Sequence, residues 1–116
     1  PDSVDLIVGV TDQDISITKY DAEGKVKEPV ARYRDFGIYG LGYMGGPSCV
    51  VSTFRLGAGG TLFARLAKVV VHEVGHTRGL PHCADTLCVM RDAVERMSTV
   101  DGAGRRLCAR CRDLLR

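Results

Sequence analysis

The sequence lacks any long apolar run of the kind that crosses a membrane. A membrane-spanning helix needs about 20 consecutive apolar residues, whereas the hydrophobic residues, 45% of this chain, are interrupted by polar ones throughout. We therefore expect a globular chain that does not enter a membrane. Its 116 residues predict a single domain over residues 1–116, with room for one modest core.

The sequence also lacks a strong excess of charge of either sign. Lys and Arg number 16 against 14 Asp and Glu, which gives a net charge of +2. Nucleic-acid-binding domains usually concentrate basic residues on one face. This balance gives no reason to expect a nucleic acid as a partner.

No secretory signal peptide is visible, although five cysteines are present. Cysteines in small secreted domains usually form disulfides, whereas clustered cysteines in a reducing compartment are more often metal ligands. We therefore expect a cytoplasmic protein. The first residue is Pro1 and a strand-like run follows at once, so we also expect a chain trimmed at its N-terminus.

Hydrophobic periodicity predicts strands in the first half of the chain. The predicted strands are apolar or alternating runs that end at turn residues, namely residues 4–10, 15–20 and 48–56. Residues 25–35 are polar and contain a proline, so we expect a loop there. Residues 36–44 interleave apolar side chains with glycine, which favours a weak edge strand; a strand that pairs with an extended peptide substrate is the alternative.

A long helix is expected over residues 61–78. Thr61 can supply its N-cap, and Gly79 followed by Pro81 can end it, because glycine accepts the left-handed cap conformation and proline cannot continue a helix. One side of the helix gathers apolar residues, namely Phe63, Leu66, Ala67, Val70 and Val74. His72 and His76 lie on the opposite side, which predicts that they face a cleft rather than the core.

The helix carries the sequence His-Glu-Val-Gly-His, in which two histidines are four residues apart. His72 and His76 are therefore one turn apart on one face, so both imidazoles can reach one zinc ion. Glu73 lies beside that metal, where a general base for a zinc-bound water belongs. After Pro81 the chain turns back, and His82 supplies a third imidazole. Three histidines leave one tetrahedral position for water, as in catalytic zinc sites; a surface histidine pair that binds no metal is the alternative.

Four cysteines after the helix predict a second zinc site. Cys83 and Cys88 are followed by Cys108 and Cys111, and the two-residue gap in the last pair is typical of zinc ribbons and fingers. Four thiolates close the coordination sphere, so this zinc would be structural and would stabilise a small domain. Two disulfides are the alternative. Cys49 lies far from the others in the sequence and is expected to be a small buried residue.

The pattern from residue 71 to residue 111 resembles one family of metallopeptidases. His-Glu-x-x-His-x-x-Gly, then Cys83, Cys88 and Met90, a gap of 17 residues and Cys-x-x-Cys is similar to the archaemetzincins, a family of the metzincin metallopeptidases. Residues 8–12 and 50–56 are similar to upstream strands of that family.

The resemblance implies an α+β fold, a metzincin-like (zincin) domain with a mixed twisted sheet and an active-site helix. It also implies a small C-terminal subdomain with a four-cysteine zinc site, which ends in a helix over residues 105–116. Met90 would then be the Met-turn residue beneath the catalytic metal. Because His82 and Cys83 are adjacent, we expect loss of the structural zinc to loosen the catalytic one.

The residues and the resemblance together predict a zinc-dependent metallopeptidase that hydrolyses peptide bonds through a zinc-bound water activated by Glu73. We expect two Zn²⁺ ions, one catalytic and one structural, a peptide or protein substrate and a monomer, with no membrane or nucleic-acid partner. Aminopeptidase and endopeptidase modes both stay open, and Asp35 and Asp85 are candidate carboxylates for holding a substrate amine. The alternative function is a non-catalytic zinc-binding module for protein or nucleic-acid interaction.

Overall fold

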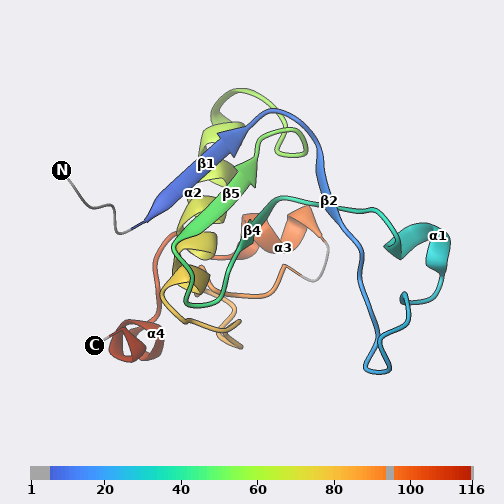
Figure 1. Ribbon diagram of the computed structural model, residues 1–116. Coiled ribbons are helices and arrows are strands. Elements are labelled where there is room, and N and C mark those ends of the chain that lie inside the picture. Colours follow the sequence, from blue (N-terminus) through green and yellow to red (C-terminus); the bar gives the residue numbers. More distant parts are fainter. Residues whose placement is uncertain (1–5, 94–95, 116) are drawn as a thin grey trace.

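A mixed three-stranded sheet lies at the centre of the fold in the computed structural model, which describes residues 6–93 and 96–115 (Figure 1). The strand order is β1-β5-β4. β1 (Ile7–Thr11) runs parallel to β5 (Ser48–Ser52), and β4 (Gly40–Gly42) runs antiparallel to β5. The mixed character of the sheet was predicted and is confirmed.

A second, two-stranded sheet extends away from this centre. β2 (Ile15–Ile17) pairs antiparallel with β3 (Phe36–Ile38), and the short helix α1 (Val30–Tyr33) lies between them in the sequence. The predicted strand 15–20 therefore ends early, and the predicted loop 25–35 contains one helical turn. The predicted strand 36–44 is divided at Tyr39, where the chain passes from one sheet to the other.

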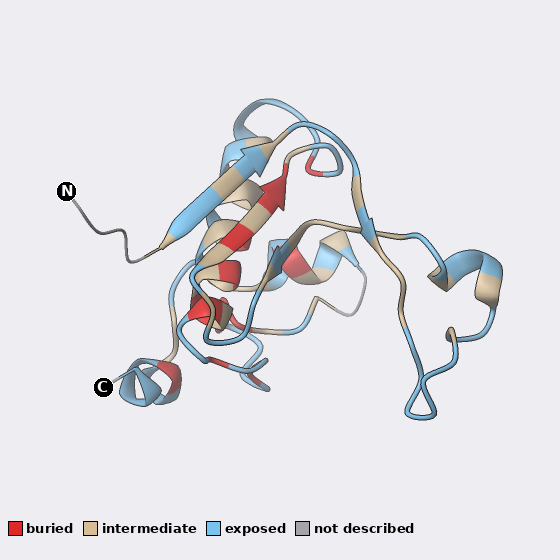
Figure 2. Ribbon diagram, in the orientation of Figure 1, coloured by how far each residue is buried: buried red, intermediate tan, exposed pale blue. Residues whose placement is uncertain are grey.

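α2 (Gly59–Thr77) is the longest helix and backs the central sheet. Val51 of β5 packs in one buried cluster with Val69 of α2 and Val100 of α3 (Met97–Gly102). Figure 2 shows these buried positions along β5 and along the turns of α2 that face it. The central sheet therefore fixes the position of the helix that carries the histidines.

One prediction about α2 is wrong and another holds only in part. The helix begins with Ala58 as its N-cap residue and no side-chain cap, so Thr61 lies inside the helix. The predicted apolar side is right only in part: Leu66 and Val70 pack against the buried cluster of β5, α2 and α3, whereas Phe63 is 71% exposed and Ala67 is also exposed. The side of the helix that packs on the sheet and α3 also carries Val69, which was not predicted there.

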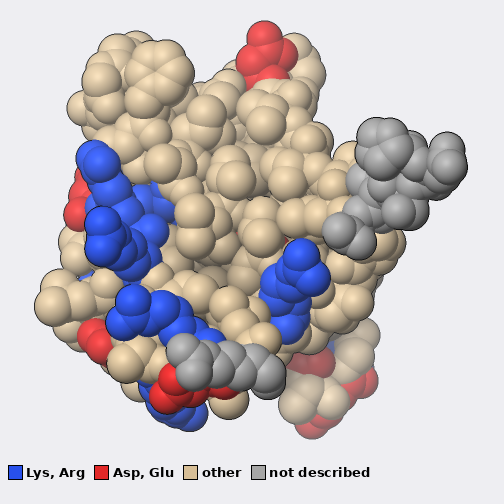
Figure 3. All heavy atoms as spheres, turned by 90° about the vertical axis from the view of Figure 1, so that its left-hand side faces the viewer, with Lys and Arg blue, Asp and Glu red and all other residues tan. Residues whose placement is uncertain are grey.

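β1 forms one edge of the central sheet and leaves apolar surface uncovered. Ile7 and Val10 are 61% and 57% exposed. Figure 3 turns the left-hand side of Figure 1 toward the viewer and shows a broad area of uncharged residues, with Lys and Arg side chains toward its margins. The predicted strand 4–10 is found at Ile7–Thr11; residues 4 and 5 lie outside the described part of the chain.

The C-terminal part differs from the prediction in its helices. α3 was not predicted, and the expected helix over residues 105–116 is reduced to α4 (Ala109–Leu114), with residue 116 outside the described part. Residues 104–106 instead lie beside the loop that contains Leu87 and Val89. The Val89 N–H donates to the Arg106 carbonyl at 3.0 Å, and the Gly104 N–H donates to the Leu87 carbonyl at 3.0 Å. Across the described ranges no helix has the length and apolar character needed to cross a membrane.

β4 is rich in glycine because it lies directly against α2. A Cβ atom at Gly42 would be 2.6 Å from the backbone carbonyl oxygen of Glu73, and one at Gly40 would be 2.8 Å from the Glu73 Cγ. β4 is an edge strand, as predicted. The chain that approaches these glycines closely is helix α2 itself.

Gly42→Ala is expected to destabilise the fold by about 1–3 kcal/mol, because the added methyl group meets backbone that cannot move without shifting α2. Urea unfolding of the two chains measures this loss. Gly60→Ala is the matched control, since a Cβ there has no atom within 4 Å and alanine favours a helix over glycine. Equal stability of Gly42→Ala and Gly60→Ala would contradict the close packing of β4.

Candidate metal centres and the cleft

A sharp change of chain direction after α2 brings His82 back toward the helix. The Leu80 N–H donates to the Gly75 carbonyl at 2.9 Å, and the Gly79 N–H donates to the His76 carbonyl at 3.0 Å. Gly79 has φ 88°, in the left-handed region. This hydrogen-bond pair is the Schellman C-cap, and it confirms the predicted end of the helix.

His72 and His76 project from consecutive turns of α2, and their Nε2 atoms are 3.1 Å apart. The Nδ1 of His72 lies 2.8 Å from the Val89 carbonyl oxygen, and the Nδ1 of His76 lies 2.8 Å from the Leu80 carbonyl oxygen. A carbonyl oxygen only accepts hydrogen bonds, so each Nδ1 donates and the lone pair of each neutral ring is on Nε2. The two lone pairs therefore face each other.

Facing lone pairs at this distance repel unless a cation lies between them. Tetrahedral zinc with Zn–N distances of about 2.0–2.1 Å holds two nitrogens about 3.3 Å apart, close to the observed 3.1 Å. The His82 ring centroid lies 5.2 Å from that of His72 and 5.0 Å from that of His76. The ligand atoms of the three histidines all lie within 4.8 Å of one another, so the donor set fits one metal ion.

The protonation of the two helix histidines also suits a metal. Burial lowers the pKa of His72 to about 4, against the opposing effect of its hydrogen bond to Val89. Burial likewise lowers the pKa of His76. Both rings are therefore neutral near pH 7, which is the state that binds metal ions.

An acidic residue that sequence reasoning missed lies beside the third histidine. The Oδ2 of Asp92 is 3.6 Å from the Nδ1 of His82. A carboxylate next to one ring nitrogen favours the proton there and leaves the other nitrogen available as a ligand. The sequence offered no signal for this pair beyond an acidic residue two positions after Met90.

Glu73 is buried between β4 and α2, with 6% of its surface exposed. Its side chain lies against Gly40 and lines the same cleft as His72 and His76. Burial raises the pKa of Glu73 to about 7, because desolvation disfavours the charged form. A carboxyl group with a pKa near neutrality can both accept and return a proton.

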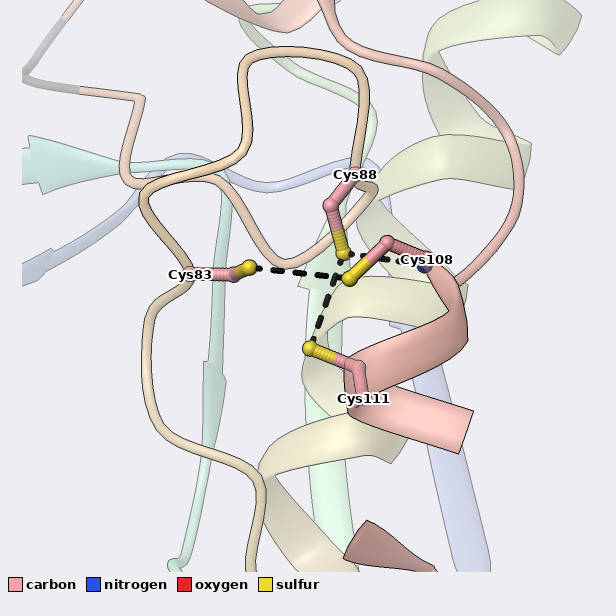
Figure 4. A group of neighbouring side chains, drawn as sticks. All are labelled: Cys83, Cys88, Cys108 and Cys111. Carbon is pink, nitrogen blue, oxygen red and sulfur yellow. Dashed lines mark hydrogen bonds between the residues drawn. The ribbon is translucent and has the colours of Figure 1, made fainter. Parts of the chain in front are cut away.

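The four predicted cysteines form a second cluster (Figure 4). Cys83 and Cys88 come from the loop after α2, and Cys108 and Cys111 come from the start of α4. Their sulfurs are 3.8 Å apart between Cys83 and Cys108, and 3.7 Å apart between Cys88 and Cys111. Tetrahedral zinc with Zn–S distances of about 2.3 Å holds sulfurs about 3.8 Å apart. All five cysteines of the chain are free, so the disulfide alternative is not adopted.

The surroundings act on these four sulfurs in opposite directions. Backbone N–H groups of Met90 and Cys108 donate to the Cys88 sulfur at 3.4 Å each. Hydrogen bonding from the Cys111 backbone is the main cause that lowers the pKa of Cys108 to about 7. Burial raises the pKa of the Cys88 and Cys111 thiols. A bound metal cation would supply the positive charge that the buried thiolates need.

One loop joins the two clusters. His82 and Cys83 are neighbours in the sequence, and the Cys83 N–H donates to the Met90 carbonyl at 2.9 Å. Met90 is fully buried, as predicted, and its sulfur packs against Gly75 between the two histidines of the helix. The third histidine therefore lies on the same loop as Cys83 and Cys88.

A cleft of about 660 Å³ opens above the three histidines and Glu73. Asp35, one of the two carboxylates predicted as a holder of a substrate amine, lines this cleft. Asp85 lies in the cysteine loop instead, where its carboxylate accepts the Leu87 N–H at 2.9 Å. Cys49 is buried in β5, as predicted, and its pKa is raised by burial.

An α+β domain whose long helix places His-Glu-x-x-His in a cleft has the pattern that is typical of zinc metallopeptidases. The sequence model of Peptidase family M54 matches residues 38–116, more than half of the chain. The chain belongs to this family, whose related proteins carry the name archaemetzincin. The resemblance stated from the sequence is therefore confirmed.

Relatives of known sequence or structure are similar along most of the chain. The archaemetzincin of Natronomonas pharaonis is 36% identical over 115 residues, which cover 90% of this chain and 61% of that protein. The crystal structure of archaemetzincin from Methanopyrus kandleri matches with a TM-score of 0.75 at 31% identity, over 96% of this chain and 54% of that one. A zinc-dependent peptidase from Methanocorpusculum labreanum matches with a TM-score of 0.72 at 28% identity, over 96% and 54%. The chain thus spans less than two thirds of the length of each of these relatives.

Proposed function

We propose that this chain is a zinc-dependent metallopeptidase with a catalytic and a structural zinc site. The observation that carries the proposal is the convergence of three imidazoles beside a buried glutamate, at a cleft large enough for an extended peptide. The chemistry of this donor set fits zinc better than the alternative of a metal-free histidine pair, because the two helix histidines direct their Nε2 atoms at each other.

His72, His76 and His82 are the proposed ligands of the catalytic zinc. When bound there, zinc supplies Lewis-acid chemistry, which polarises a carbonyl and makes water a better nucleophile. The carbonyls of Val89 and Leu80 orient the two helix imidazoles by accepting their Nδ1 protons.

Glu73 is the proposed general base. Its carboxylate takes a proton from the attacking water and returns it to the leaving amine, a role that its raised pKa favours. The closeness of Gly40 and Gly42 to Glu73 supports this role, because β4 holds the carboxylate side chain against the helix. We also propose that Met90 is the Met-turn residue of a metzincin-like site, because its buried sulfur packs against Gly75 between the two helix histidines.

Cys83, Cys88, Cys108 and Cys111 are the proposed ligands of the structural zinc. Their role is to hold the loop that carries His82, since they join this loop to the start of α4.

Metal analysis together with a peptide digest tests the proposed function. Mass spectrometry of the native protein is expected to find two zinc ions per chain, and the zinc-loaded chain is expected to cleave members of a peptide library. A chelator should stop cleavage. A folded chain that contains no zinc, or a fully loaded chain that cleaves no peptide, would overturn the proposal.

A further inference from the structure

The cleft above the histidines is lined by more basic than acidic side chains. The basic ones are Lys19, Arg32, Arg55, Lys68 and Arg91. Three acidic side chains also line the cleft, and one of them is Glu73, the proposed base. A cleft with this balance attracts anions more than cations.

Lys68 lies on the same face of α2 as His72, one turn earlier, which places its Cα about 6 Å along the helix from that of His72. Its Nζ donates to the carbonyls of Val100 and Asp101, at 3.1 and 2.9 Å. The Asp101 carboxylate is held by Arg65 through two bonds of 2.8 Å. The Lys68 ammonium group has three N–H donors, so these two bonds leave one donor unused at the end of α3.

Arg91, in the loop that follows Met90, also lies near the end of α3. Its Nη1 lies 3.8 Å from where a Cβ of Gly102 would be, next to the Asp101 carbonyl that Lys68 contacts. Within residues 6–93 and 96–115, no carboxylate is paired with the Arg91 guanidinium. Two cations that line the cleft, one from α2 and one from the loop after Met90, therefore both lie near the end of α3.

The walls around these two cations are apolar. Val69 of α2, Val100 of α3 and Ala103 line the cleft there. Such walls fit the methylene groups of a side chain, and their low polarity strengthens the attraction between a carboxylate and the cations. An arginine offers paired N–H donors that match the two oxygens of a carboxylate.

We propose that Lys68 and Arg91 form a subsite that binds a carboxylate of the peptide substrate, next to the bond that is cut. The inference rests on the proposed peptidase function and names the substrate class of that site. The carboxylate can come from the side chain of Asp or Glu, or from the C-terminus of the peptide. The first source gives cleavage beside acidic residues inside a chain, and the second gives removal of C-terminal residues.

Four matched peptides separate the two sources. In the first pair both peptides have an amidated C-terminus, and they differ in having Glu or Gln beside the scissile bond. In the second pair both peptides have Gln at this position and end next to the bond, and they differ in having a free or an amidated C-terminus. A preference of at least about tenfold in kcat/KM is expected for the member of one pair that carries the carboxylate, as for a charge-assisted hydrogen bond. Preference within the first pair identifies the side chain, and preference within the second identifies the terminus.

Arg91→Gln is expected to reduce that preference to less than about threefold, and Arg91→Glu is expected to reverse it in favour of a Lys peptide. Arg112→Gln is the control for net charge, because Arg112 is exposed on α4 away from the cleft. It is expected to keep the parental preference. Zinc content and circular dichroism of each variant check that the fold is retained.

A binding measurement keeps this test independent of hydrolysis. Fluorescently labelled versions of the same peptides are titrated into the Glu73→Gln chain, where the carboxylate-bearing peptide is expected to bind at least about tenfold more tightly than its neutral counterpart. Equal binding of charged and neutral peptides, or equal preference in Arg91→Gln and the parent, overturns the subsite. Absence of cleavage with selective binding overturns the proposed peptidase function and leaves the subsite standing.

Discussion

Glu73→Gln is expected to reduce kcat/KM for peptide hydrolysis by about 10²–10⁴-fold while both zinc ions are retained, because general acid–base catalysis contributes about that much. Glutamine has nearly the same shape, so the contact with Gly40 and Gly42 is kept. It cannot take a proton from water at neutral pH. Peptide hydrolysis and metal content of the same preparation measure the two halves of this prediction.

The pH profile gives an independent signature of the same group. Burial raises the pKa of Glu73 to about 7, so the basic form is lost as the pH falls through that value, and a nearby zinc ion moves this limb to lower pH. The parent is therefore expected to show an acid limb at or below about pH 7, which the residual activity of Glu73→Gln lacks. Glu23→Gln, in an exposed turn, should behave as the parent. A Glu73→Gln chain as active as the parent would exclude Glu73 as the base.

Cys111→Ser is expected to remove the structural zinc and to lower the free energy of unfolding by about 4 kcal/mol or more, since loss of a metal is among the few changes with effects of this size. Cys111 is 2% exposed, and its sulfur lies 3.7 Å from that of Cys88. The loop that carries His82 is then no longer held to α4. Zinc content is expected to fall from two ions per chain to one weakly held ion, with reduced hydrolysis.

Cys49→Ser is the matched control for this substitution. Cys49 is as well buried as the cluster cysteines, with 6% of its surface exposed, but it lies in β5. Its replacement costs only the burial of a hydroxyl group, so the zinc content should stay at two ions. Titration with a chelator, followed by unfolding in urea, measures both variants. Two tightly held zinc ions in Cys111→Ser would show that this cysteine is not a ligand.

The sequence was most informative where chemistry depends on spacing along the chain. Gly79 and Pro81 predicted the end of α2, and the Schellman hydrogen bonds at Gly79 agree with that position. The spacing of the histidines and of the cysteines predicted two groups of ligands, and the fold brings the members of each group together. Helical periodicity and the ligand preferences of zinc are local properties, which explains why they can be read before the fold is known.

Features that depend on contacts between distant segments were not predicted. Phe63 was placed on the core side of α2 together with Leu66 and Val70, although it is exposed and Val69 is the residue buried there. Periodicity locates apolar side chains, but it does not tell which of them other elements cover. α3 is too short to leave a periodic pattern, and it brings the Asp101 carbonyl to Lys68. The sequence therefore did not predict that Lys68 and Arg91 both lie near the end of α3.

The parallel pairing of β1 with β5 has a consequence for the order in which the chain folds. Ile7 lies opposite Ser48, so β2, β3, β4 and α1 all fall within the loop that this pairing closes. Closing a long loop costs entropy before any contact offsets it, whereas a helix forms from neighbours along the chain. α2 is thus available early, and the central sheet forms against it late. Folding speed should accordingly depend on the segment between Thr11 and Ser48 more than on the helix that carries the histidines.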